Sequence, residues 1–165
     1  MRNRHGISTE GRSATILGTG DAAKTAAFYL RDHGVRDVHM VSRNPKQMGS
    51  EFPVLSYQEL ALSNGTDLLV NCTPIGMYPN VGETPLEKKL LGHFSAVVDV
   101  IYNPIETKLL ADAKALGIQT CNGLAMLIGQ AVYAEELWQS RRISLAMLDP
   151  LVESLNEIFV LDRPA

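Results

Sequence analysis

The chain has 165 residues, of which 45% are hydrophobic and 20% are charged, and its formal net charge is −3. This length suits one domain with a sizeable core, whereas the weakly acidic charge excludes the basic surface that nucleic acid requires. No apolar run reaches membrane-spanning length, and the first residues lack the apolar core of a signal peptide. We therefore expect a cytoplasmic protein with neither nucleic acid nor membrane as a partner.

The N-terminal part predicts a short leader followed by one domain. Residues 1–13 are polar and without periodicity, and we expect a loose leader or the remnant of a linker there. The domain is expected over residues 14–160. It opens with an apolar run of strand length at 14–17, and a helical pattern that ends near 33–34 follows a glycine turn.

That glycine turn has the spacing Gly-x-Gly-x-x-Ala, typical of a dinucleotide-binding site, at Gly18, Gly20 and Ala23. Gly18 permits a tight turn, Gly20 lets a diphosphate approach the backbone, and Ala23 lets helix and strand pack closely. The free N–H groups of the helix N-terminus then face the anion. The alternative is a plain strand–turn–helix connection that happens to use glycine.

The rest of the chain alternates short apolar runs with segments of helical periodicity. The expected strands are residues 38–41, 52–56, 67–71, 96–100 and 118–121. The expected helices are residues 57–62, 106–116, 123–139 and 146–158, and Pro45 can open a further short helix. Strands that are apolar throughout belong to a parallel sheet buried on both faces. We predict an α/β fold, a Rossmann-like doubly wound parallel sheet in a single domain with extra C-terminal helices.

The two cysteines, Cys72 and Cys121, lie at the ends of predicted strands and lack the spacing of metal ligands. We interpret both as small buried thiols in a reducing compartment. The sequence therefore predicts no metal site.

The end of the second strand indicates which nucleotide the turn prefers. An NAD-binding turn usually places a carboxylate about 20 residues after the glycines to hold the ribose hydroxyls, but this chain has Ser42, Arg43 and Asn44 there. The Arg43 guanidinium suits a 2′-phosphate, and Lys46 adds a second positive charge. This favours NADP over NAD, and the alternative is a solvated basic turn.

Asp21 within the glycine turn disfavours nucleotide binding. Its carboxylate lies near the expected diphosphate and repels it, or it caps the helix and occupies the donors that a phosphate would use. Either role predicts weaker nucleotide binding than a glycine at this position would give.

Five ordered stretches carry a family resemblance: residues 18–23, 42–44, 71–77, 99–107 and 122–131. Over residues 14–160 the chain resembles the C-terminal, NADP-binding domain of shikimate dehydrogenase and its shikimate/quinate relatives. By this resemblance, the diphosphate would lie at Gly18, Thr19, Gly20, Asp21 and Ala22, and the adenosine phosphate at Ser42, Arg43, Asn44 and Lys46. The rest of the cofactor would lie along Thr73 and Met77, with Val100 near the nicotinamide and the Gly123 backbone at its carboxamide.

The resemblance also implies that Tyr102 and Gln130 face the substrate. From the residues alone, Tyr102 could equally be a half-buried core residue with its hydroxyl in water. Gln130, a polar residue on an otherwise apolar helix face, could equally make a structural hydrogen bond to a neighbouring turn.

The family's N-terminal domain, which binds shikimate and supplies a catalytic lysine and aspartate, has no counterpart in this sequence. We assign no catalytic residue, since hydride transfer to a carbonyl also needs a proton carrier and an oriented substrate. The resemblance implies NADP-linked reduction of 3-dehydroshikimate to shikimate, in aromatic amino acid biosynthesis, only if another chain supplies the substrate domain. We expect the isolated chain to bind NADP with little or no dehydrogenase activity.

Two alternatives remain open. One is a non-catalytic binding or assembly module that retains the fold, and the other is an NAD-using quinate/shikimate dehydrogenase relative. The resemblance also implies that the C-terminal helices lie near the domain junction of two-domain relatives, so that here this surface would be uncovered, and we expect self-association or a partner chain to bury it.

Overall fold

The computed structural model describes residues 6–45, 50–144 and 147–161. A six-stranded sheet with the order β3-β2-β1-β4-β5-β6, parallel throughout, forms its centre. The strands are β1 Ser13–Leu17, β2 Asp37–Ser42, β3 Val54–Ser56, β4 Leu68–Asn71, β5 Ala96–Asp99 and β6 Gln119–Cys121. The helices are α2 Asp21–Asp32, α3 Tyr57–Leu62, α4 Lys88–Leu91, α5 Lys108–Ala115, α6 Leu124–Gln139 and α7 Leu148–Leu161. The predicted α/β fold is confirmed.

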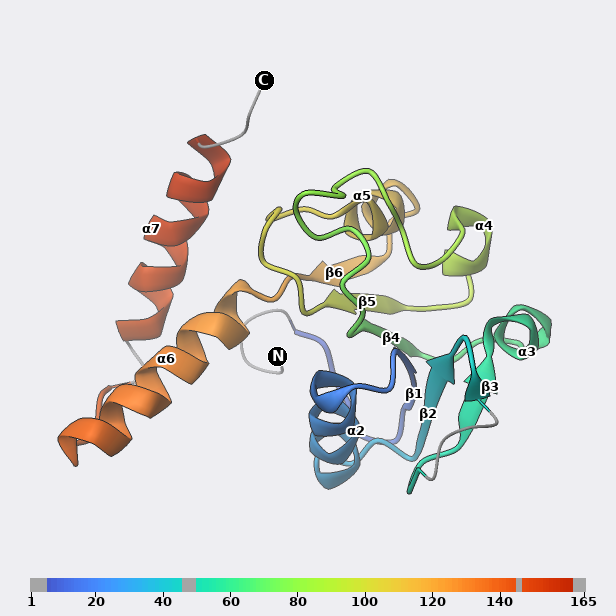
Figure 1. Ribbon diagram of the computed structural model, residues 1–165, viewed down its shortest axis with the longest axis horizontal. Helices are drawn as coiled ribbons and strands as arrows, with labels where there is room; N and C mark the ends of the chain where they lie inside the picture. The colour runs from blue at the N-terminus through green and yellow to red at the C-terminus, as the bar shows by residue number, and fades with distance from the viewer. Residues whose placement is uncertain (1–5, 46–49, 145–146, 162–165) are drawn as a thin grey trace.

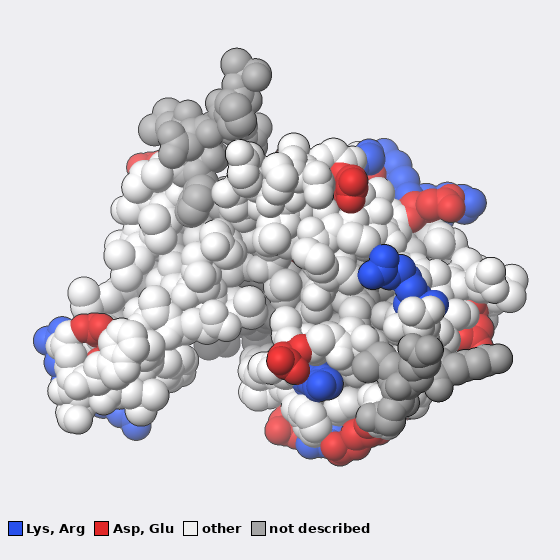
Figure 2. All heavy atoms as spheres, viewed as in Figure 1, with Lys and Arg blue, Asp and Glu red and all other residues white. Residues whose placement is uncertain are grey.

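The last two helices stand apart from the sheet and form an arm (Figure 1). Helix α6 starts directly after β6 and α7 packs on it. Large apolar side chains of α6 are exposed, with Tyr133 58%, Leu137 79% and Trp138 80% accessible. On the face that Figure 2 shows, charged side chains are sparse over this α6–α7 arm except at the far end of α6. No helix in the described ranges is both long and apolar enough to cross a membrane.

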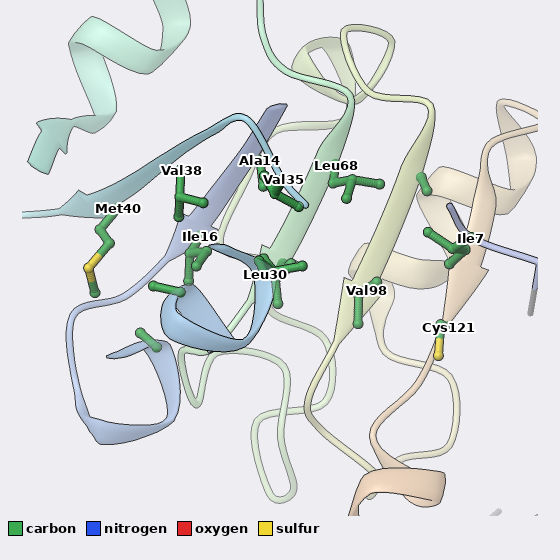
Figure 3. Packing of buried hydrophobic residues seen from close by; sticks show 14 residues of the cluster. Ile7, Ala14, Ile16, Leu30, Val35, Val38, Met40, Leu68, Val98 and Cys121 are labelled. Carbon is green, nitrogen blue, oxygen red and sulfur yellow. The ribbon is translucent and has the colours of Figure 1, made fainter. Parts of the chain in front are cut away.

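Two apolar clusters sandwich the sheet, because its strands are buried on both faces. The first cluster packs α2 against the sheet through Ala23, Ala27 and Leu30, and Figure 3 shows it from close by. The second places side chains of α3, α4 and α5, such as Leu60, Leu91 and Leu109, on the opposite face. Helix α4 was not expected, since four residues are too few for apolar periodicity to reveal a helix.

Residues 6–13, the described part of the expected leader, are packed against the domain. Ile7 is 1% exposed and joins the first cluster on the side of β6 (Figure 3). The buried Thr9 hydroxyl donates a hydrogen bond to the His33 carbonyl at 2.8 Å. This segment is therefore not loose, although one isoleucine in a polar stretch has no periodic signal by which to predict it.

Candidate nucleotide-binding cleft

The strand order reverses between β1 and β4, and the glycine turn lies at that point, where parallel α/β sheets bind their ligands. The Gly18 amide donates to the Val41 carbonyl at 2.9 Å, and the Cys72 amide donates to the Leu17 carbonyl at 2.9 Å. Gly18 has a φ of +106°, and a Cβ on it would lie 3.2 Å from the Cys72 oxygen. Glycine is needed here because the turn is both left-handed and closely packed.

Gly20, the N-cap residue of α2, faces open space: a Cβ added to it would meet nothing within 4 Å. No side chain caps the helix N-terminus, so its first N–H groups remain available to an anion. Below them, Ala23 is fully buried in the first apolar cluster, which brings α2 close to the sheet as expected.

The carboxylate of Asp21 is fully exposed and lies 3.5 Å from the Lys24 ammonium. The alternative that Asp21 caps the helix is therefore wrong, because Gly20 occupies the cap position and Asp21 is the first helical residue. Its negative charge remains beside the open N-terminus, partly offset by Lys24.

A cleft of about 430 Å³ opens beside the glycine turn, at the carboxyl ends of β4 and β5. One wall is residues 72–78 and the other is residues 100–103, and the Tyr78 amide joins them by donating to the Asn103 carbonyl at 3.1 Å. The cleft is lined by Cys72, Thr73, Pro74, Met77, Tyr78, Val100, Ile101, Tyr102 and Asn103. The structure thus brings together four residues predicted for cofactor and substrate, namely Thr73, Met77, Val100 and Tyr102.

A buried polar network lies beneath both walls of this cleft. Asn71, Asp99 and Thr107 are almost completely buried. The Asn71 side-chain amide donates to Asp99 Oδ1 at 3.0 Å, and the Thr107 hydroxyl donates to Asp99 Oδ2 at 2.8 Å. The Ile101 amide also donates to Asp99 Oδ1, at 3.1 Å. Both carboxylate oxygens therefore have partners.

Burial raises the pKa of the Asp99 carboxyl, while the hydrogen bonds from Thr107, Ile101 and Asn71 oppose the shift. Burial, together with the nearby Asp99 charge, raises the pKa of the Cys72 thiol to about 12. Burial also raises the pKa of Cys121, and both cysteines are free thiols. The buried interpretation holds fully for Cys121 and partly for Cys72, which keeps some exposure. Neither thiol is poised as a nucleophile.

The backbone of Gly123, where α6 begins, packs directly against the cleft residues Val100 and Ile101. Its amide donates to the Ile101 carbonyl at 3.0 Å. A Cβ on Gly123 would lie only 1.9 Å from the Val100 oxygen, which is far inside any real contact. Glycine is required here because the strand end and the helix start are in direct backbone contact.

The second strand ends in a turn that the Ser42 hydroxyl stabilises by accepting from the Asn44 amide at 3.1 Å. Arg43 is exposed. Burial raises the pKa of the nearby Tyr57 hydroxyl, and the positive charge of Arg43 opposes part of this shift. Lys46 lies outside the described residues. Ser42, Arg43 and Asn44 share the carboxyl edge of the sheet with the cleft but do not line it.

No protein-family model matches the chain, but individual relatives do. It is 37% identical to the NADP(+) shikimate dehydrogenase of Clostridium beijerinckii over 95% of this chain and 58% of that protein, and 37% identical to that of Clostridium perfringens over 94% and 59%. A chorismate mutase/shikimate 5-dehydrogenase fusion protein from Clostridium acetobutylicum has a TM-score of 0.91 at 38% identity, covering 96% of this chain and 59% of that one. The chain is a homologue of the shikimate dehydrogenases.

It spans less than two thirds of the shikimate dehydrogenases that it matches. The structure of shikimate dehydrogenase 1 from Peptoclostridium difficile repeats this pattern, with a TM-score of 0.90, 37% identity, and coverage of 96% of this chain and 60% of that one. The likeness therefore includes the sheet and most of the arm.

Among the residues predicted to face the substrate, Tyr102 lines the cleft and is 38% exposed, so it is not a core residue. Gln130 is exposed on α6 and is not a lining residue of the cleft. The alternative of a structural hydrogen bond for Gln130 is not realised with any described residue.

Sequence reasoning missed the buried trio of Asn71, Asp99 and Thr107. The available signal was a polar residue closing each of two otherwise apolar strands, which requires a buried partner. The described ranges hold no group of three or more His, Cys, Asp or Glu that could bind a metal ion.

Proposed function

We propose that this chain is the NADP-binding half of a shikimate dehydrogenase. The observation that carries the proposal is the cleft at the carboxyl ends of β4 and β5, lined by Thr73, Met77 and Val100, which opens beside the glycine turn at Thr73. The family membership supports the same nucleotide, since relatives are NADP(+) enzymes and a solved relative from Thermus thermophilus holds NADP(H) and shikimate.

Each part of the site has a physical role in this proposal. The uncapped N-terminus of α2 binds the diphosphate above Gly20, and the Arg43 guanidinium pairs with the 2′-phosphate. Val100, which lines the cleft, and the Gly123 backbone beside it would hold the nicotinamide and its carboxamide. Tyr102, which lines the cleft, and Gln130, which is exposed on α6, would face the substrate.

The chain alone should reduce 3-dehydroshikimate slowly or not at all. Reduction of the ketone requires a proton donor within hydrogen-bond reach of its oxygen. The described residues that line the cleft include no Lys, His, Asp or Glu. A bound nucleotide would supply the hydride, and in this proposal the proton carrier would come from the part of the relatives' length that this chain does not span.

The exposed α6–α7 arm is the surface that the substrate-binding domain covers in this proposal. The match to the fusion protein and to the Peptoclostridium difficile enzyme extends over 96% of this chain, so the arm keeps its place in proteins with additional chain. An apolar helix such as α6 is normally buried, and here Leu137 and Trp138 are about four-fifths exposed. Self-association through the same surface is the competing outcome.

The test is a calorimetric titration of the purified chain with NADPH and NADH, followed by an assay with 3-dehydroshikimate. Saturable binding with a preference for NADPH, and reductase activity at least about a thousandfold below that of a two-domain relative, is the expected result. Activity close to that of a full-length relative would contradict the half-enzyme, and tighter binding of NADH would favour an NAD-using quinate/shikimate relative.

A second candidate is a non-catalytic module that retains the fold, and the exposed Asp21 carboxylate at the anion site favours it. Titration of Asp21→Gly and of a matched control, Asp32→Asn at the other end of α2, distinguishes the two. If wild type binds no nucleotide at millimolar concentration and Asp21→Gly does, the acidic turn has closed the site and the module leads. If both bind, with Asp21→Gly about threefold tighter at low salt, the half-enzyme stands.

A further inference from the structure

We propose that Asp99 is a positioning residue that fixes both walls of the cleft in the shape that the nicotinamide end of the nucleotide requires. The inference rests on the proposed function, because it assigns the cleft to the nucleotide. Asp99 itself is fully buried and does not line the cleft, so it acts through its neighbours.

The link to the first wall runs through Asn71. Its side-chain amide donates to Asp99 Oδ1, which orients its own Oδ1 towards residue 73. That oxygen accepts from the Thr73 amide at 3.0 Å and from the Thr73 hydroxyl at 2.7 Å. Asp99 therefore determines the rotamer of Asn71, and Asn71 holds the loop that starts the 72–78 wall.

The link to the second wall is direct. Asp99 Oδ1 also accepts from the Ile101 amide, which fixes the backbone as it leaves β5 for the 100–103 wall. Its other oxygen accepts from Thr107, whose hydroxyl also caps α5 by accepting from the Leu110 amide at 3.3 Å. One carboxylate thus joins two strand ends and a helix start beneath the cleft.

Three donors converge on the two oxygens of Asp99, and a carboxylate can accept all of them. An asparagine can keep Oδ1 as the acceptor and donate its amide to the Thr107 hydroxyl, which can rotate. A leucine of similar size leaves all three donors unpaired in a buried place, which disorders both walls. The predicted series is therefore Asp99→Asn close to wild type and Asp99→Leu impaired.

The experiment measures NADPH affinity by calorimetry and amide hydrogen exchange at Thr73 and Ile101, using the whole chain. Asp99→Leu should weaken NADPH binding about tenfold or more and speed exchange of both amides by a similar factor. Asp99→Asn should restore both quantities to within about threefold of wild type. If Asp99→Leu does not fold, Asn71→Leu replaces it, because it removes the link to Thr73 and leaves Asp99 bonded to Ile101 and Thr107.

The matched control is Asp67→Asn, at the opposite end of β4, where the carboxylate accepts from the Ser13 amide and hydroxyl at 2.9 Å each. It should lower stability and leave NADPH affinity within about twofold. A folded Asp99→Leu or Asn71→Leu that binds NADPH as tightly as Asp67→Asn would overturn the positioning role. If wild type itself does not bind NADPH, the proposed function fails, and unchanged exchange in Asp99→Leu would separately overturn the fixing of the walls.

Discussion

The carboxyl edge of the sheet and the α6–α7 arm differ in how their side chains are buried and paired. Beneath the cleft, polar side chains are buried and paired, and no described buried side-chain nitrogen or oxygen is without a hydrogen-bond partner. On the arm, apolar side chains such as Tyr133, Leu137 and Trp138 face the solvent. The polar groups of the first region have hydrogen-bond partners within the chain, whereas the large apolar side chains of the second remain exposed.

This difference separates what the chain does alone from what it needs another surface to do. A preorganised polar network fixes a binding site without outside help. An exposed apolar face of this kind marks an interaction site. The comparison therefore predicts that cofactor binding is autonomous and that the arm depends on a partner domain.

The junction between the two regions should be the most sensitive place in the molecule. Gly123→Ala places a Cβ 1.9 Å from the Val100 oxygen, so we expect it to lower the free energy of unfolding by about 3 kcal/mol or more. Gly20→Ala is the control, because its Cβ meets nothing and should change stability by less than about 1 kcal/mol. Urea unfolding measures both, and a mild Gly123→Ala would show that β5 and α6 are not in fixed contact.

Substitutions on the α6–α7 arm should weaken association with a partner and leave the free energy of unfolding nearly unchanged. Leu137→Ser combined with Trp138→Ser removes two exposed side chains, so the free energy of unfolding should stay within about 1 kcal/mol. Association with a separately produced shikimate dehydrogenase substrate domain should weaken about tenfold or more, because buried aromatic residues dominate interfaces. Light scattering of the chain alone completes the test: a dimer that this double variant dissociates would assign the surface to self-association.

Arg43 tests whether the carboxyl edge of the sheet distinguishes NADPH from NADH. Arg43→Gln should weaken NADPH binding about tenfold, the scale of one charge-assisted hydrogen bond, and leave NADH binding unchanged. Arg36→Gln is the matched control, since Arg36 precedes β2 and pairs with Asp37 at 2.7 Å. Equal losses for both nucleotides would mean that Arg43 contacts something other than the 2′-phosphate.

The last prediction concerns Cys72, and its effect appears only in alkali. Its pKa in the folded chain is about 12, above the ordinary value of 9.0, so the folded state retains the thiol proton that the unfolded state loses. Stability from this group is complete below pH 9 and falls as pH rises from 9 towards 12. The free energies of unfolding of wild type and Cys72→Ala, measured in urea, should differ by a constant amount below pH 9. Above pH 9 the free energy of unfolding of the wild type should fall relative to that of the variant.

The architecture was predictable because apolar runs, helical periodicity and glycine turns are short-range patterns in the sequence. Every other expected strand and helix appears, and α3 has the expected bounds of residues 57–62, whereas the short helix that Pro45 could open lies outside the described residues. The glycine turn also followed from local spacing, whereas Thr73, Met77 and Val100 were predicted through the resemblance to shikimate dehydrogenase, and all three line the cleft.

The remaining features depend on contacts far apart in the chain. Asn71 and Asp99 are 28 residues apart, and only the pairing of β4 with β5 brings them together. The burial of Ile7 requires the finished sheet. The exposure of Leu137 and Trp138 on α6 is contrary to the composition of that helix, because a helix this rich in apolar residues normally predicts burial. Such a departure is informative, since in the proposed function it marks the surface that a second domain would cover.

The backbone contact between Gly123 and Val100 makes the start of α6 a pivot. Helix α6 has 16 residues and is therefore about 24 Å long. A rotation of about 10° about this contact would move its far end by about 4 Å. Because Val100 and Ile101 line the cleft, a surface that holds the far end of the arm would also constrain one wall of the cleft.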